Sequence, residues 1–240
     1  LASTLPHENP AMFERYAIYC TFDGNLGAKG AAWLGWDVGN GINVNQPQIS
    51  NLDLGQVTRK PRKYGFHATI KAPFRLVERT TEQQLKSAFS ELCATLQPAP
   101  SDGLQIAQIG RFLALILIGD DTSVKDLAQQ VVEALDPFRA PLTDADIARR
   151  APSRLSDQQR YNLNKWGYPH VMSDYRFHVT LTGSLKADEL YSAKKAAQAY
   201  FSEVLTKPFT IAYLTLAGER SDGMFCEIMR LPLPFAQRML

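Results

Sequence analysis

Two similar heptapeptides, Tyr64-Gly65-Phe66-His67-Ala68-Thr69-Ile70 and Tyr175-Arg176-Phe177-His178-Val179-Thr180-Leu181, lie 111 positions apart in a chain of 240 residues. Tyr, Phe, His and Thr are identical between the two copies, and the last position is a branched aliphatic residue in both. A helix and then two strands are expected after each copy. These elements are expected near 80–96, 104–109 and 112–118 after the first copy, and near 187–205, 209–216 and 224–229 after the second. The shared order predicts a duplicated chain.

The duplication predicts one bilobal domain spanning 1–240. The first lobe is expected at about 12–118 and the second at about 119–240. Residues 1–11 have neither a basic start nor an apolar run, and we interpret them as an extension that adds little to the fold.

The segments outside the repeats are expected to be short elements and loops. Residues 15–22 are rich in aromatic side chains and predict a strand. Apolar residues recur every three or four positions in 123–138, which predicts a helix. Residues 24–62 are rich in Gly, Asn and Pro and are expected to be mostly loop. Residues 140–172 are expected to hold short helices, and with several arginines and Trp166 they could form a lid over a site.

The composition is that of an ordinary globular protein. Charged residues make up 21% and hydrophobic residues 45%, and 26 Lys and Arg against 24 Asp and Glu give a net charge of +2. This small charge argues against a non-specific nucleic-acid coat and suits a small anionic substrate met by a few local cations. No apolar run approaches ~18 residues, so no membrane contact is expected. Three scattered cysteines without a Cys-x-x-Cys pair indicate free thiols in a reducing, cytoplasmic compartment.

Side chains alternate between the two faces of a strand, so each heptapeptide has an apolar face and a polar face. The polar faces extend past the heptapeptides and carry Gly65, His67, Thr69 and Lys71 in the first copy and Arg176, His178, Thr180 and Thr182 in the second. If the two lobes face each other, these faces form a cleft with one imidazole and one hydroxyl on each wall.

Two imidazoles in one cleft can act together as general base and general acid. An imidazole suits both roles because its ordinary pKa of ~6.5 lets both forms coexist near neutrality. We assign His178 as the base and His67 as the acid, although the symmetry of the two motifs leaves the opposite order open. Thr69 and Thr180 can donate hydrogen bonds to phosphate oxygens. This chemistry requires no metal and no cofactor.

Several nearby side chains have a structural and a functional interpretation. Lys71, Arg176 and Arg111 could neutralise a phosphoryl group, although Lys71 could equally be a solvated strand end and Arg111 a turn residue. Tyr64 and Tyr175 could contact the substrate, and anchoring of the strands is the simpler role for both.

Two basic segments could border the cleft. The run Thr58-Arg59-Lys60-Pro61-Arg62-Lys63 directly precedes the first heptapeptide, and a second cluster consists of Arg149, Arg150, Arg154 and Arg160. Either segment could attract an anionic substrate, or could simply be solvated.

The strings His67-Ala68-Thr69-Ile70 and His178-Val179-Thr180-Leu181 resemble the signature of the two-histidine (2H) phosphoesterase superfamily, also called LigT-like. Longer stretches look like one bacterial branch of it, described as phosphonate metabolism proteins of unknown function. These stretches are residues 15–19, 64–74, 135–142, 166–169 and 176–183.

The resemblance implies a bilobal α+β fold in which two antiparallel sheets face a central cleft and the helices lie outside. It also implies acid–base catalysis by His67 and His178 and phosphate binding by Thr69 and Thr180. Members of this branch are usually encoded beside phosphonate-utilisation genes, which implies a small phosphorylated substrate such as a cyclic ribose phosphate.

The sequence thus predicts a metal-independent phosphoesterase that opens a cyclic phosphodiester of a sugar phosphate or nucleotide. One alternative is a 2′,3′-cyclic phosphodiesterase acting on RNA ends, which would use the basic segments. Another is a protein that binds a phosphorylated ligand without turning it over. The sequence leaves the oligomeric state open.

Overall fold

The computed structural model describes residues 13–150, 155–205 and 208–235, so the predicted extension at 1–11 lies outside the described residues. The strands are β1 (Tyr16–Thr21), β2 (Trp36–Asp37), β3 (Ile42–Asn43), β4 (His67–Phe74), β5 (Ala99–Ser101), β6 (Gly103–Ile109), β7 (Phe112–Ile118), β8 (Val179–Thr180), β9 (Phe209–Ile211), β10 (Tyr213–Glu219) and β11 (Phe225–Pro232). The α-helices are α1 (Gly24–Leu34), α2 (Leu54–Val57), α3 (Arg59–Arg62), α4 (Glu82–Cys93), α5 (Thr122–Ala134), α6 (Asp144–Arg150), α7 (Asp157–Trp166) and α8 (Ala187–Phe201). Two 3₁₀ turns, η1 (Asp136–Phe138) and η2 (Met172–Asp174), follow α5 and α7.

The predicted α+β class with antiparallel strands is confirmed. Seven strands form a sheet in the order β11-β10-β1-β4-β8-β7-β6, and every pairing in it is antiparallel. The two sheets expected from the sequence are two parts of this one sheet, because the two heptapeptide strands are neighbours. β4 and β8 meet where Ala68 pairs with Val179, and both side chains are fully buried.

The two parts of the sheet exchange hairpins. The hairpin β10–β11, which follows the second heptapeptide in sequence, lies beside β1, whereas the hairpin β6–β7, which follows the first, lies beside β8. The short strands that lead into these hairpins, β5 and β9, also pair with each other. Each part of the sheet therefore contains strands from before and after residue 118.

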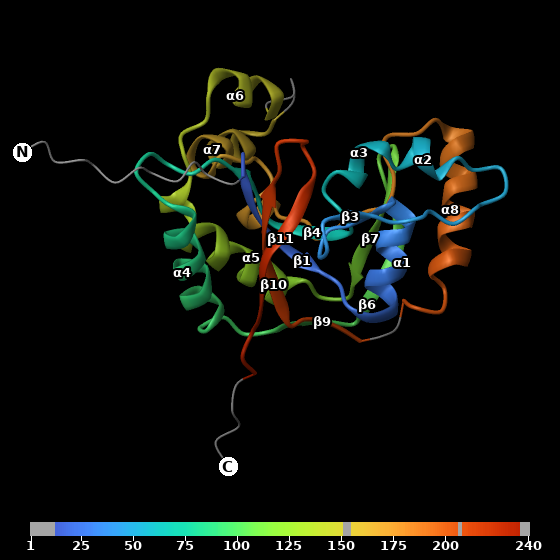
Figure 1. Cartoon of the computed structure of the whole chain (residues 1–240), viewed down its shortest axis with the longest axis horizontal. Helices are drawn as coiled ribbons and strands as arrows, with labels where there is room; N and C mark the ends of the chain where they lie inside the picture. Colours follow the sequence, from blue (N-terminus) through green and yellow to red (C-terminus); the bar gives the residue numbers. More distant parts are fainter. Residues whose placement is uncertain (1–12, 151–154, 206–207, 236–240) are drawn as a thin grey trace, which may run out of the picture.

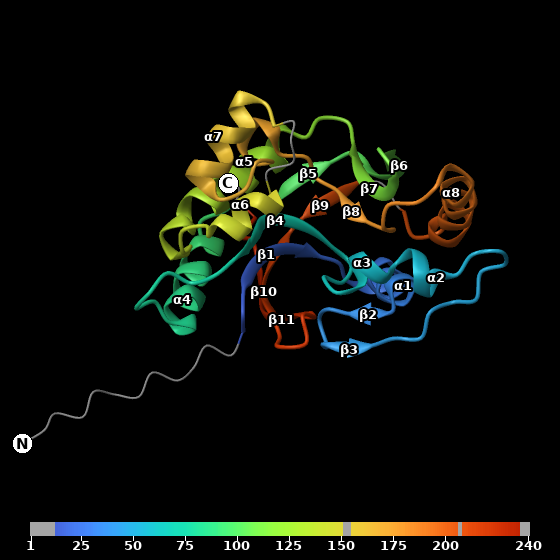
Figure 2. The ribbon, with the colours of Figure 1, turned by 90° about the horizontal axis from the view of Figure 1, so that it is seen from above.

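Helices gather at the two ends of the sheet. Figures 1 and 2 show α4 to α7 at one end and α1 to α3 with α8 at the other. Apolar side chains hold α4, α5 and α8 on the sheet, and the fully buried ones include Leu85 and Phe89 of α4, Val124 and Val131 of α5, and Ala193, Ala197 and Phe201 of α8. The capping box of α4 joins Thr81 and Gln84.

Residues 24–62 were expected to be mostly loop, and this prediction is wrong. They contain α1, α2, α3 and the short hairpin β2–β3. Glycine lowers helix propensity, but in α1 it permits close packing. A Cβ atom on Gly30 would lie 2.2 Å from the ring of Phe66, so the residue that weakens the helix locally is the one that lets it lie against β4.

Candidate active site

The paired motifs place each histidine opposite the threonine of the other motif. Because Ala68 pairs with Val179 in an antiparallel ladder, the register sets His67 against Thr180 and His178 against Thr69. Residues directly opposite each other share one face of a sheet, with Cβ atoms about 4.5–5.5 Å apart. The two histidines and two threonines therefore form a compact square on the face opposite the buried Ala68 and Val179.

Both imidazoles are held by the same backbone contact. Nδ1 of His67 lies 2.9 Å from the carbonyl oxygen of Gly65, and Nδ1 of His178 lies 2.9 Å from that of Arg176. A carbonyl can only accept, so each contact assigns a hydrogen to Nδ1. Nε2 is then the atom of each neutral ring that can take up a proton. In His67 it lies 3.1 Å from Oγ1 of Thr69, whose hydroxyl can donate to it.

His67 is held in the neutral form. Burial lowers its pKa to about 4, the Gly65 carbonyl opposes this shift, and the nearby His178 adds to it. The ring also lies against that of Tyr19, with 3.7 Å between the centroids and 30° between the planes. A neutral ring whose Nε2 carries no hydrogen is equipped to accept a proton at neutral pH.

Two pockets of about 280 Å³ each meet at His67, Thr180 and Tyr64. The first, which we call the Lys60 pocket, is further lined by Lys60, Pro61, Gly65, Phe112, Thr182, Gly183 and Ser184. The second, the Tyr19 pocket, is further lined by Arg15, Tyr19, Thr69, Ala72, Pro73 and Tyr168. His178 lies outside the described lining of both pockets, with its ring 6.2 Å from that of Phe112.

A β-bulge in β4 takes Lys71 away from this group. Thr69 pairs with Tyr19, but Lys71 pairs with Ile18, so one extra residue on β4 shifts the alternation. The ammonium group is buried and donates to the carbonyl of Val132 and, at 3.3 Å, to Asp136. Burial lowers its pKa to about 8. The expected position of Lys71 beside His67 and Thr69 is therefore wrong, and Ala72 lines the pocket instead.

The other predicted side chains are mostly anchors. The hydroxyl of Tyr175 donates to the backbone carbonyl of Thr69 and so ties the two motifs together. Nε of Arg111 donates to the carbonyl of Leu185, which holds the β6–β7 turn. Arg176 is exposed, and its carbonyl holds His178. Thr182 is buried, where its Oγ1 accepts from the amide of Leu113 and donates to the carbonyl of Gly183.

The basic run 58–63 contributes one charged side chain to the pockets. Lys60 lines the Lys60 pocket, as expected of a residue just before the first motif. Arg62 instead donates to the carbonyls of Leu34 and Gly55, and Lys63 lies over the ring of Tyr64. Arg62 is thus a structural residue.

The segment 140–172 is helical, as predicted, and it reaches the site through Tyr168. Arg160 forms an ion pair with Asp157, and Arg154 lies outside the described residues, as do the side chains of Arg149 and Arg150. Arg15 and Tyr19 were not singled out from the sequence as site residues. Only their neighbourhood in the fold identifies them.

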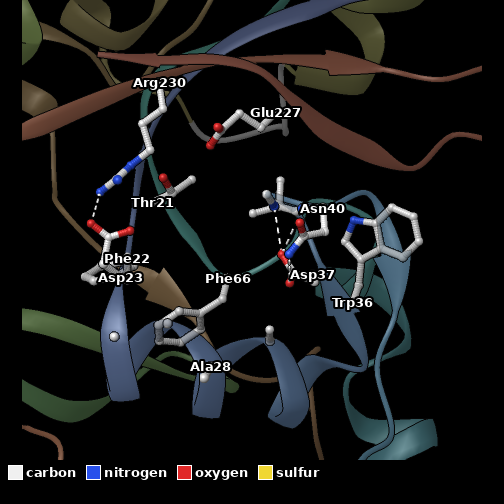
Figure 3. A pocket seen from close by; sticks show the side chains of 15 residues that line it. Thr21, Phe22, Asp23, Ala28, Trp36, Asp37, Asn40, Phe66, Glu227 and Arg230 are labelled. Carbon is white, nitrogen blue, oxygen red and sulfur yellow. Dashed lines mark hydrogen bonds and ion pairs between the residues drawn. The ribbon is translucent and has the colours of Figure 1, made fainter. Parts of the chain in front are cut away.

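A larger pocket, of about 390 Å³, lies beside α1 and contains no histidine in its described lining. Figure 3 shows Arg230 paired with Asp23 on one wall and Asp37 paired with Asn40 on the other, with Phe66 turned toward α1. Arg230 and Asp37 thus have polar partners in the pocket wall, and Glu227 also lines the pocket. Proton transfer is better served by the two pockets at His67.

The described part of the chain shows neither a metal site nor a membrane span. No three of its His, Cys, Asp and Glu side chains are grouped so that they could hold a metal ion. None of its helices is both long and apolar enough to cross a bilayer.

The comparisons with known proteins connect the chain to one family. The model of the family described as proteins of unknown function, DUF1045, matches residues 69–226. Two curated relatives are both named ribose 1,5-bisphosphate phosphokinase PhnN. The one from Janthinobacterium sp. (strain Marseille) is 37% identical over 228 residues, which are 91% of this chain and 50% of that protein. The one from Laribacter hongkongensis (strain HLHK9) is 32% identical over 229 residues, 90% of this chain and 51% of that protein.

The chain therefore spans about half the length of these curated relatives. Among solved structures, that of E. coli LigT complexed with 3′-AMP is similar with a TM-score of 0.43 and 11% identity, over 93% of this chain and 98% of that one.

Proposed function

This chain belongs to the DUF1045 family, and from its site we propose that it is a metal-independent phosphoesterase that opens a cyclic phosphodiester of a small phosphorylated metabolite. The observation that carries the proposal is the square of His67, Thr180, His178 and Thr69 set by the pairing of Ala68 with Val179. Two imidazoles and two hydroxyls on one face are a complete set for acid–base chemistry at a phosphate.

In the proposed reaction His67 is the base and His178 is the acid, the reverse of the order assigned from the sequence. Nε2 of His67 takes a proton from water, and the water oxygen forms a bond to phosphorus. The ring P–O bond breaks, and the leaving oxygen takes a proton from His178. The products are a phosphomonoester and a free hydroxyl. The burial that lowers the pKa of His67 to about 4 supports this order, because the ring is neutral at physiological pH.

The phosphate oxygens would be held by donors around the square. Thr69 and Thr180 have hydroxyls on the shared face, and Thr180 lines both pockets. Lys60 replaces Lys71 as the cation that we propose for charge neutralisation, because it lines a pocket that contains His67 and Thr180. Arg176 is exposed beside His178, and we propose it as a second cation for the approach of the anion.

The name of the two curated relatives supports a sugar phosphate as the substrate class. That name refers to ribose 1,5-bisphosphate. The resemblance stated from the sequence points to phosphonate metabolism. The kinase activity of the relatives belongs to proteins twice as long, and we do not transfer it. The RNA-end alternative loses support, because Arg62 of the basic run is engaged inside the fold.

The test is hydrolysis of a ribose cyclic phosphate and of 2′,3′-cyclic nucleotides in EDTA. His67→Ala and His178→Ala should each lower the rate by about 10²–10⁴-fold. The matched control is His170→Ala, a histidine outside both motifs whose ring lies against Tyr168; its turnover number should be unchanged. Tight binding with no turnover would instead identify a non-catalytic binder, and full activity in both motif variants would exclude the mechanism.

A further inference from the structure

Tyr19 of β1 is a fully buried residue beside His67 that the proposed mechanism does not use. Its hydroxyl is enclosed, yet no described residue lies within hydrogen-bond distance of it. Enclosing a hydroxyl without a partner is unfavourable, so such groups are rare in folded proteins and call for a reason. A ligand that completes the hydrogen bond would supply one.

Tyr19 is one of the residues that line the Tyr19 pocket. The charges that act on its hydroxyl belong to Tyr64, Arg15 and Glu219, and the first two of these residues line that pocket with Tyr19 itself. Burial raises the pKa of Tyr19 well above its ordinary value, so the hydroxyl stays protonated. Toward a ligand oxygen it would act as a donor.

The lining indicates the chemistry of the ligand. Tyr19, Tyr64 and Tyr168 contribute aromatic rings and hydroxyls, and Thr69 and Thr180 contribute two more hydroxyls. The one charged lining residue among those described, Arg15, is already neutralised by two contacts of 2.5 and 2.7 Å with Glu219. An electrically balanced pocket of ring faces and hydroxyls suits a sugar ring better than a second phosphate, which would need a free cation.

We propose that the Tyr19 pocket holds the sugar ring of the substrate, with the Tyr19 hydroxyl donating to one of its oxygens. The proposal rests on the proposed function, because the phosphate bound at His67 and Thr180 places the attached ring in one of the two adjoining pockets. At about 280 Å³ the Tyr19 pocket lies near the lower end of the range for small-molecule sites, ~300–1,000 Å³, as a single ring requires.

The test measures binding, so that it does not depend on turnover. Dissociation constants are determined by calorimetry for ribose 1-phosphate and for inorganic phosphate, in the wild type and in Tyr19→Phe. The substitution keeps the ring against His67 and removes only the hydroxyl. We expect the constant for ribose 1-phosphate to rise about 3–10-fold, the value of one hydrogen bond, and the constant for phosphate to stay the same. The unliganded variant should also melt about 2–4 °C higher, because the unpartnered hydroxyl is gone.

Tyr16→Phe is the matched control. Tyr16 is also on β1 and also buried, but its hydroxyl donates to Glu82 at 3.1 Å, outside the pocket. That variant should melt lower than the wild type and bind both probes normally. An unchanged ribose 1-phosphate constant in Tyr19→Phe, or an equal loss for both probes, would overturn the sugar assignment. If Tyr19→Phe weakens binding of ribose 1-phosphate alone and the wild type hydrolyses no cyclic phosphodiester, the sugar site is supported and the proposed enzymatic activity is rejected.

Discussion

His67 and Thr180 lie opposite each other on neighbouring strands, because Ala68 and Val179 pair at the centre of the sheet. Thr69 and His178 stand in the same relation. Each histidine therefore lies opposite the threonine of the other heptapeptide, so both heptapeptides are needed to form either pair. The predictions below separate the residues of this square from those that only support it.

Thr180 and Thr182 are close in sequence but should respond differently to loss of the hydroxyl. Thr180 lines both pockets, so Thr180→Val should lower kcat/KM about 10–100-fold with little change in stability. Thr182 satisfies the buried amide of Leu113, so Thr182→Val should lower the free energy of unfolding by about 1–3 kcal/mol. Enzyme assays and urea unfolding of both variants would check this. The reverse pattern would move the phosphate contact to Thr182.

The pH dependence follows from the lowered pKa of His67. As the base it must be neutral, so the acid limb of kcat/KM should fall at a pH of about 4 and not near 6.5. Between these values the unfolded chain binds a proton that the folded protein does not, so the free energy of unfolding should decrease as the pH is lowered through this window. His67→Asn should remove that part of the decrease. An acid limb near pH 6.5 would argue that His67 is not the base.

Lys71 should be dispensable for catalysis. Its ammonium is buried against the Val132 carbonyl and Asp136, on the far side of the bulge in β4. Lys71→Met keeps the length of the side chain and leaves Asp136 paired with Arg139, so kcat/KM should match that of the wild type. Lys60→Met is the companion variant, and its KM should rise severalfold. A large kinetic defect in Lys71→Met with normal unfolding would return Lys71 to the phosphate site.

Gly30 should tolerate no side chain. A Cβ at this position would lie 2.2 Å from the Phe66 ring, so Gly30→Ala must push α1 away from β4. A loss of about 1–3 kcal/mol in the free energy of unfolding is expected, although alanine has the higher helix propensity. Gly30→Ala combined with Phe66→Leu should recover part of the loss. Thermal melts of both variants provide the measurement, and a more stable Gly30→Ala would contradict the packing.

The elements most clear from the sequence were those with strong periodicity. The helices α4, α5 and α8 and the hairpin β6–β7 appear where expected, whereas the strand expected over 209–216 is divided into β9 and β10 and the second heptapeptide forms only the short strand β8. The prediction that His67, Thr69 and Thr180 share one site also agrees with the lining of the two pockets. Periodicity succeeds here because it predicts which face of an element is buried. Both heptapeptides bury the face that carries their Phe and aliphatic residues.

What the sequence did not reveal depends on contacts between distant segments. Strict alternation placed Lys71 on the wrong face, because the bulge arises from the register between β1 and β4. The helix α1 was missed, because the close contacts of Gly27 with the Phe22 carbonyl and of Gly30 with the Phe66 ring appear only in the fold. Tyr19 resembles any aromatic residue of a buried strand. What distinguishes it is a buried hydroxyl without a hydrogen-bond partner among the described residues, and this is visible only in the folded structure.

The exchange of hairpins has a consequence for how the protein is made. β1 leaves the ribosome well before its partner β10 (Tyr213–Glu219), because Tyr16 pairs with Gly218, far along the chain. Until those residues have been synthesised, one edge of β1 is an open row of amides and carbonyls, which is a template for pairing with another chain. Such distant pairing slows folding and prolongs this exposure. We therefore expect chains truncated before residue 213 to aggregate, whatever the integrity of the first heptapeptide.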